Sequence, residues 1–128
     1  MEIVVTDERD ERFIGMCESF GCFIDEPQVV LLLMNFNKTV GCTSFKVYDA
    51  DSAEITTLFL NSYDERERIS YKLIRQLEKI AMDYEFKSIV VSFDSRDDIL
   101  IEIFEKLDYE FVENTDEILL KKEFKSLI

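Results

Sequence analysis

The chain has 128 residues, of which 47% are hydrophobic, and this suits one compact domain over residues 1–128. Its 28 acidic residues outnumber the 15 basic ones and give a formal net charge of −13. This balance argues against a nucleic-acid partner, because such proteins neutralise phosphates with clustered Lys and Arg. The excess of acid favours solubility, and a cationic partner is the second interpretation.

The side chains that most often bind metals or act as bases are scarce. The chain has no histidine, and Cys17, Cys22 and Cys42 show no C-x-x-C spacing. We therefore predict no metal site and no Ser-His or Cys-His catalytic pair. The N-terminus lacks the features of a signal peptide, and the apolar run at 29–34 is too short to span a bilayer. These features predict a soluble cytoplasmic protein with free thiols and no membrane partner.

The first predicted element is a helix that starts near Asp7, with Thr6 as its cap and acidic residues in its first turn. It is expected to end between Gly21 and Pro27. Its apolar residues recur at helical spacing and predict a buried face formed by Phe13, Met16, Cys17 and Phe20.

Three strands are predicted next. The continuous apolar run at 29–34 indicates a buried strand, and a turn leads to a second strand at 40–48. After another turn, residues 53–60 alternate in polarity and are rich in β-branched side chains. The short connections predict an antiparallel meander.

A loop then leads into an amphipathic helix that ends near Tyr84. Its apolar side carries Ile69, Leu73, Ile74, Leu77, Ile80 and Ala81, and its polar side carries Lys72, Arg75, Glu78 and Lys79. Residues 87–93 form a fourth strand, which the helical crossover should place parallel to the third.

The last part of the chain predicts a helix and two short strands, at 109–112 and 117–124. Asp94 or Ser95 is the expected cap of the helix, and Asp97 and Asp98 fall in its first turn. Its predicted core stripe consists of Ile99, Leu100, Ile103, Phe104 and Leu107.

This order of elements and the local sequence resemble the GNAT (Gcn5-related N-acetyltransferase) superfamily over roughly residues 29–124. The resemblance implies an α/β (α+β) fold with a mixed central sheet, in which an antiparallel meander precedes a parallel crossover strand and helices cover both faces. It does not fix the function, because folds are reused. The stretches that carry it are KTVGCTSFK (38–46), AEITTLFL (53–60), ISYKLIRQLEKIA (69–81) and IFEKLDYEF (103–111).

In that family, the junction between the third strand and the following helix holds the pyrophosphate of acetyl-CoA, and the resemblance places the motif on residues 65–70. Glu65 replaces an Arg or Gln, and Arg68 replaces the glycine that lets backbone N–H groups approach phosphate; only Ser70 is close to the pattern. Losing two or three charge-assisted hydrogen bonds, at about 1.5–3 kcal/mol each, removes much of the roughly 8 kcal/mol that a micromolar ligand gains. Ordinary acetyl-CoA binding is therefore doubtful.

Two interpretations of this charged loop remain. Basic side chains can contact phosphate oxygens in place of the backbone, and four of them lie close together in the sequence here: Arg66, Arg68, Lys72 and Arg75. Alternatively, residues 65–68 are a solvated run of alternating charge. The cofactor contacts that the resemblance implies are Leu58, Leu60, Arg66, Arg68, Ile69 and Ser70.

The resemblance also points to the proton-transfer groups. Many relatives carry a tyrosine in the last helix that protonates the departing thiolate of CoA, but this chain has Phe104 there and Asp108 in place of a glycine. Losing a general acid costs about two to four powers of ten in rate, and Phe104 is expected to be core. Glu54 lies where several relatives keep a carboxylate that accepts the amine proton; a solvent-facing glutamate is the alternative. Tyr63 and Tyr71 are other phenols near the junction.

Two functions follow. The first is a GNAT-like protein with weakened or lost acetyl-CoA turnover, which binds a basic protein partner or another ligand. The second is an active acetyl-CoA-dependent N-acetyltransferase that acts on a small amine or peptide amine. A third idea, an acidic mimic of nucleic acid, depends on charge alone. Relatives sometimes pair through their last strands, so a homodimer is consistent with the resemblance.

Overall fold

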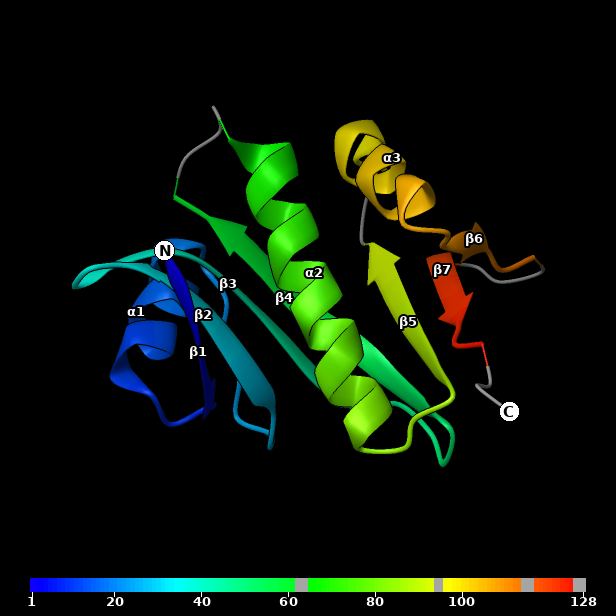
Figure 1. Cartoon of the computed structure of the whole chain (residues 1–128), viewed down its shortest axis with the longest axis horizontal. Coiled ribbons are helices and arrows are strands. Elements are labelled where there is room, and N and C mark those ends of the chain that lie inside the picture. Colours follow the sequence, from blue (N-terminus) through cyan, green and yellow to red (C-terminus); the bar gives the residue numbers. More distant parts are fainter. Residues whose placement is uncertain (62–64, 94–95, 114–116, 126–128) are drawn as a thin grey trace.

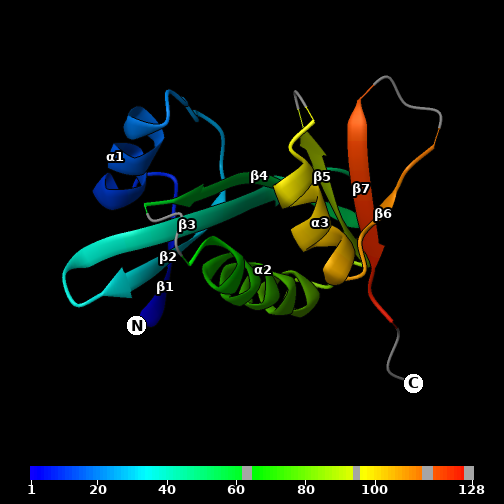
Figure 2. The same ribbon diagram turned by 90° about the horizontal axis from the view of Figure 1, so that it is seen from above.

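The computed structural model describes residues 1–61, 65–93, 96–113 and 117–125. Within these residues the chain forms one seven-stranded sheet with helices on both faces (Figures 1 and 2). The strand order is β1-β2-β3-β4-β5-β7-β6. In chain order the elements are β1 (Glu2–Asp7), α1 (Glu11–Ser19), β2 (Val29–Asn35), β3 (Lys38–Val47), β4 (Ser52–Leu60), α2 (Arg66–Asp83), β5 (Ser88–Phe93), α3 (Asp98–Lys106), β6 (Glu110–Phe111) and β7 (Ile118–Glu123).

The strand directions follow from the connections. β1 to β4 pair as antiparallel neighbours. α2 carries the chain from β4 back to the start of β5, so these two strands are parallel. β7 pairs antiparallel with β5, and the short β6 lies at the edge beside β7. The predicted mixed sheet, with a meander followed by a parallel crossover strand, is confirmed.

The sheet separates two hydrophobic cores. α2 and α3 cover one face and α1 covers the other (Figure 2). Leu31 and Leu33 of β2 belong to the core under α2, whereas Val30 and Leu32 belong to the core under α1. Alternate side chains of a strand point to opposite faces, so a strand that is covered on both sides is apolar at every position.

The N-terminal segment differs from the prediction. Glu2–Asp7 is the edge strand β1, which pairs antiparallel with β2, and not the lead into a helix capped by Thr6. The helix itself is present, but its predicted start near Asp7 was wrong, because residues 3–6 are β-branched and, together with Asp7, pair with the open edge of β2. α1 begins only at Glu11.

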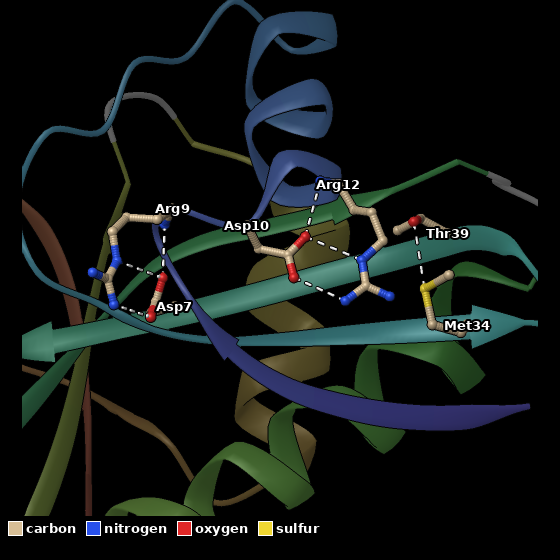
Figure 3. Close-up of polar contacts among 6 residues, drawn as sticks. All are labelled: Asp7, Arg9, Asp10, Arg12, Met34 and Thr39. Carbon is tan, nitrogen blue, oxygen red and sulfur yellow. Dashed lines mark hydrogen bonds and ion pairs between the residues drawn. The ribbon is translucent and has the colours of Figure 1, made fainter.

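Asp10 is the observed cap of α1. Its carboxylate accepts the backbone N–H of Arg12 at 2.9 Å and two guanidinium N–H groups at 2.8 and 3.0 Å (Figure 3). The side-chain hydrogen bond from Arg12 is the main reason why the pKa of Asp10 falls to about 2. Asp7 and Arg9 form a similar pair in the turn before the helix.

The buried face of α1 is confirmed for Phe13, Met16 and Cys17 but not for Phe20, which is 44% exposed. Phe20 is the C-cap residue, and its φ of −99° and ψ of 9° depart from the helix, so the helical period no longer directs its side chain into the core. Its ring stacks instead on Phe59 of β4, with 4.6 Å between the centroids.

α2 buries the predicted apolar residues Ile69, Leu73, Ile74, Leu77 and Ala81, with Ile80 partly buried. No helix in the described part of the chain is long and apolar enough to cross a membrane.

Glu78, expected on the polar side of α2, is buried instead. Its carboxylate accepts hydrogen bonds from the Tyr109 hydroxyl at 2.8 Å and from Lys122 Nζ at 3.0 Å. The prediction failed because only the tertiary structure brings these two donors, which are distant in sequence, beside the helix.

α3 begins later than expected. Its cap is Asp97, whose carboxylate accepts the backbone N–H of Leu100 at 3.0 Å, so Asp97 precedes the first turn and Asp98 lies in it. The predicted caps Asp94 and Ser95 lie outside the described residues. Of the predicted core stripe, Ile99 is 61% exposed because it lies in the first turn and faces away from the sheet.

Candidate functional site

The centre of the sheet opens into a fork between β4 and β5. The two strands pair only from Ser52↔Ser88 to Ile55↔Val91. Beyond that pair, β4 continues to Leu60 and β5 to Phe93 while the strands diverge (Figure 1). One edge of β4 beyond Ile55 therefore has no strand partner in the described structure.

A bulge in β4 lies where the fork begins. Ser44 of β3 pairs with Thr57 and Phe45 pairs with Ile55, so Thr56 is an extra residue on β4. Such an insertion bends a strand and increases its twist, which turns β4 away from β5.

Hydroxyl groups hold this bulge. Ser44 Oγ lies 2.8 Å from Thr56 Oγ1 and 2.6 Å from Thr57 Oγ1. Thr43 Oγ1 donates to the Thr57 carbonyl at 2.7 Å, and Thr56 Oγ1 donates to Gln28 Oε1. The sequence analysis did not predict this hydroxyl cluster, although the adjacent threonines Thr56 and Thr57 are a local signal for it. The segment before β2 is thereby tied to the fork.

Beyond the bulge, Leu58 and Leu60 lie on the part of β4 that borders the fork. Both side chains are partly buried against the core under α2. On the neighbouring strand β3, Gly41 pairs with Leu60 and leaves room for this packing. A Cβ at Gly41 would lie 2.9 Å from Leu60 Cδ2 and 3.4 Å from Ile69 Cγ2.

The first turn of α2 carries its own ion pairs. Glu65 is at the N-cap position but makes no side-chain cap, and its Oε2 lies 2.8 Å from Arg68 Nη2. Glu67 accepts hydrogen bonds from Tyr71 at 2.8 Å and from Lys106 of α3 at 3.1 Å. The hydrogen bond from Tyr71, followed by that from Lys106, lowers the pKa of Glu67. These side chains border a hollow of about 510 Å³.

Arg66 points toward α3 and not into that hollow. Its Nη2 lies 3.0 Å from Asp97 Oδ2. The backbone hydrogen bond from Leu100, and then the hydrogen bond from Arg66, lower the pKa of Asp97. The pair links the first turn of α2 to the cap of α3.

Ile69 and Ser70 lie on the buried face of α2. They are 1% and 0% exposed, so their side chains belong to the core. The N–H of Ile69 donates to the Glu65 carbonyl at 2.9 Å, within the helix. Ser70 Oγ is the one buried side-chain polar atom without a hydrogen-bond partner among the described residues.

Glu54 lies one residue before the last pair of β4 with β5, on the face opposite α2. Its neighbours Ala53 and Ile55 pack in the core under α2, and alternation turns Glu54 to the other side. Its side chain is 21% exposed, and its Oε1 lies 3.9 Å from Lys46 Nζ. Lys46 in turn donates to Glu26 at 2.9 Å, and this bond raises the pKa of Lys46.

Phe104 of α3 is 1% exposed, as its core role predicted. Its ring packs edge-on against Phe93 and Tyr109, with centroid distances of 5.9 and 5.0 Å. Asp108 has a φ of +71°, a left-handed conformation that glycine adopts freely and Asp tolerates. Tyr63 lies outside the described residues.

No protein-family model and no curated protein matches the sequence. Solved structures do match over nearly the whole chain, and all those that follow are acetyltransferases. An aminoglycoside 6'-acetyltransferase type Ii superposes with a TM-score of 0.79 at 19% identity, covering 96% of this chain and 97% of that one. The fold is that of the GNAT acetyltransferases.

Two further structures support the GNAT fold. An aminoglycoside 6'-N-acetyltransferase from Enterococcus faecium gives a TM-score of 0.72 at 16% identity, covering 96% of this chain and 97% of that one. A GNAT family acetyltransferase from Elizabethkingia anophelis with acetyl-CoA bound gives 0.70 at 12% identity, covering 95% and 98%. At such identities the likeness establishes the fold, and chemistry has to be argued from this chain's own residues.

The first turn of α2 does not fit a diphosphate held in the usual GNAT manner. That manner needs bare backbone N–H groups, but Arg68 replaces the glycine and the carboxylates of Glu65 and Glu67 lie in the same turn. A diphosphate would have to displace Glu65 from Arg68 and Glu67 from Lys106. It would leave two carboxylates without their partners beside its own negative charge.

Three other features bear on acetyl transfer: the fork, the position of Phe104 and the hydroxyl of Tyr71. At the fork, Leu58 and Leu60 lie on the part of β4 that continues beyond its last pair with β5. No proton donor occupies the position of Phe104, because a phenyl ring has no acidic hydrogen. The hydroxyl of Tyr71 is hydrogen-bonded to Glu67, and its pKa is raised by burial and by that carboxylate.

Proposed function

We propose that this protein is a GNAT N-acetyltransferase-like protein with weakened or lost acetyl-CoA turnover, which uses its cleft or acidic surface to bind another ligand or a basic partner. One observation carries the proposal: basic side chains around the first turn of α2 already hold carboxylates. The pairs are Arg66–Asp97, Arg68–Glu65 and Lys106–Glu67, at 3.0, 2.8 and 3.1 Å.

The electrostatic argument concerns the cost of exchanging partners. An ion pair between exposed side chains contributes up to about 1 kcal/mol, and like charges at similar spacing repel by a similar amount. A diphosphate that took Arg68 from Glu65 would gain one attraction, lose another and add a repulsion. The net affinity at this turn is therefore far below that of a turn with free N–H groups and cations.

Isothermal titration calorimetry with acetyl-CoA and with free coenzyme A tests the proposal. We expect no saturable heat at concentrations of about 1 mM, which corresponds to a binding free energy weaker than about −4 kcal/mol. Saturable binding in the low micromolar range would contradict the proposal. Circular dichroism of the same sample shows that the protein is folded during the titration.

An active acetyl-CoA-dependent N-acetyltransferase, acting on a small amine or peptide amine, is the second candidate. The position of Glu54 next to the fork favours it, because a carboxylate there can accept a proton from an amine that approaches from the face of the sheet opposite α2. The net charge of −13 would also attract a cationic substrate.

A matched pair of variants tests the second candidate. Release of free thiol from acetyl-CoA is measured with a panel of polyamines and basic peptides. If turnover is found, Glu54→Gln should lower kcat by about two to four powers of ten while binding of acetyl-CoA is unchanged. Glu26→Gln is the control, since it removes the other carboxylate bound to Lys46 but not the one beside the fork. Equal activity of the two variants would remove Glu54 from the mechanism.

A further inference from the structure

All three thiols of the chain gather in the core under α1. Cys17 and Cys42 are 5% and 0% exposed, and Cys22 is partly buried against the same cluster. None of them is in a disulfide. They do not form a metal site, because no group of three metal-binding side chains is suitably arranged within the described residues.

The end of α1 brings two of these thiols together. Gly21 has a φ of +68°, and the N–H of Cys22 donates to the Cys17 carbonyl at 2.8 Å. This is the 6→1 hydrogen bond of a Schellman motif, which commonly brings the side chains at its two ends together. Cys22 packs against the cluster that contains Cys17, so both side chains enter the same core.

We propose that Cys17 and Cys22 are a site of reversible thiol oxidation, and that a peroxide converts them to a disulfide in the folded protein. Cys22 is the more accessible thiol, so the oxidant reaches it first. The Cys22 thiol and hydrogen peroxide give a sulfenic acid and one water. The Cys17 thiol then attacks that sulfur, the S–S bond forms, and the second water leaves with the thiol proton. Two thiols are thereby oxidised while one peroxide is reduced to two waters.

Cys42 takes no part in this reaction. It lies in β3, where its residue pairs with Leu32 on one side and Phe59 on the other, so its backbone cannot move toward α1. Disulfides require a narrow range of Cα separations and Cβ directions, which fixed backbones seldom meet by chance. Burial raises the pKa of the Cys42 thiol to about 12 and that of the Cys17 thiol to about 11, so position and not acidity separates the two. By contrast, Cys17 and Cys22 are close because a local motif sets their spacing.

Oxidation has a structural consequence beyond the thiols. A Cys17–Cys22 bond fixes the end of α1 in the conformation that its backbone hydrogen bonds already favour. Two residues of the segment that follows α1 accept hydrogen bonds from the sheet at the start of the fork. Glu26 accepts from Lys46, and Gln28 accepts from Thr56. The redox state of the pair therefore acts on the segment that lines the α1 side of the fork.

Tryptic mapping tests the proposal directly, because the cleavage sites separate the thiols. Peptide 13–38 contains Cys17 and Cys22, and peptide 39–46 contains Cys42. Reduced native protein is treated with hydrogen peroxide, the peroxide is removed, and the protein is then unfolded in urea with iodoacetamide and digested, so that buried thiols are also alkylated. We expect peptide 13–38 to become two hydrogen atoms lighter and to carry no alkyl group, while 39–46 is alkylated. Subsequent reduction should restore both alkylation sites in 13–38.

Two variants and one change of conditions complete the test. Cys42→Ala should leave the oxidation of peptide 13–38 unchanged, whereas Cys22→Ser should abolish it. In denaturant, where the motif is lost, the same treatment should give mixed pairings that include Cys42. A link between peptides 13–38 and 39–46 under native conditions would overturn the proposal, as would a peptide 13–38 that keeps two alkylated thiols or gains oxygen at Cys22.

Discussion

Arg68 and Glu65 face each other within a single turn of α2, with 2.8 Å between Nη2 and Oε2. Both side chains are more than half exposed, so their ion pair adds little to stability. Its importance is electrostatic. The pair places a carboxylate, and a guanidinium already bound to that carboxylate, where the resemblance to the GNAT superfamily implies free backbone N–H groups. The first prediction follows from this pair.

Removing the two carboxylates of this turn should create affinity for coenzyme A. In Glu65→Gln combined with Glu67→Gln, Arg68 loses the carboxylate of Glu65, and Lys106 loses that of Glu67 but still has Glu102 at 3.4 Å, so both cations become more available to phosphate oxygens. Each released charge is worth about 1 kcal/mol at an exposed site, so the affinity should rise by about 30-fold. Calorimetry with coenzyme A measures the change.

Glu11→Gln combined with Glu18→Gln is the control matched for net charge. Glu11 and Glu18 lie exposed on α1, on the other face of the sheet, and replacing both should leave coenzyme A binding as in the wild type. A similar gain in both double variants would mean that overall charge, and not the carboxylates of α2, sets the affinity.

Gly41 is required for α2 to pack on the sheet. A Cβ at this position would meet Leu60 Cδ2 at 2.9 Å and the Phe59 carbonyl oxygen at 3.0 Å. Gly41→Ala should therefore lower the free energy of unfolding by about 1–3 kcal/mol, as overpacked cores do. Urea denaturation followed by circular dichroism measures this.

Gly15→Ala provides the opposite case on α1. A Cβ there meets no atom within 4 Å, and alanine favours a helix over glycine by about 0.5–1 kcal/mol. The two substitutions add the same methyl group, so they should shift the unfolding midpoint in opposite directions. Equal shifts would show that the contacts at Gly41 do not limit the packing.

Tyr109→Phe should destabilise the protein by about 1.5–3 kcal/mol, the value of a hydrogen bond to a charged group. The Tyr109 hydroxyl donates to the buried carboxylate of Glu78 at 2.8 Å, and burial followed by that carboxylate raises the pKa of Tyr109. Thermal or urea unfolding checks the loss. Tyr71→Phe is the control, because Tyr71 donates to the exposed Glu67 and its removal should cost less than about 0.5 kcal/mol.

The cap of α1 predicts an acid-dependent loss of stability. The pKa of Asp10 is about 2 in the folded protein against an ordinary value of 3.8, so the carboxylate stabilises the fold fully above that ordinary value. The contribution is lost as the pH falls from about 4 to about 2, because the unfolded chain then binds a proton that the folded chain resists.

Asp10→Asn isolates this charge, since asparagine also caps helices. The variant should be less stable than the wild type by about 1 kcal/mol above pH 4, and the difference should close by about pH 2. Urea unfolding at both ends of this range measures it. A difference that persists at the acid end would assign the loss to cap geometry instead of charge.

The strands at the centre of the sheet could be predicted from the sequence, and the N-terminal strand could not. The run at 29–34 is apolar at every position because both faces of β2 are covered, and this is a local signal. β1 lacks such a signal, because its Val5 is 53% exposed and its strand conformation depends on pairing with β2.

The candidate site divides in the same way. The predictions of an altered phosphate motif at Glu65 and Arg68 and of a missing donor at Phe104 depend on residue identity, so the sequence alone supplies them. The partners of Arg66 and Glu67 are Asp97 and Lys106, at the cap and the end of α3, about 30 to 40 positions further along the chain and at distances that only folding sets.

By itself the sequence determined the order of most strands and helices, the apolar faces that pack them and the side chains at the first turn of α2, since these follow from local periodicity and chemistry. Tertiary structure alone decided that β4 bulges at Thr56, that Glu78 is buried beside Tyr109 and that Cys17, Cys22 and Cys42 share the core under α1. The physical reason is that these features depend on pairing register, helix termination and long-range contacts, which no single stretch of sequence contains.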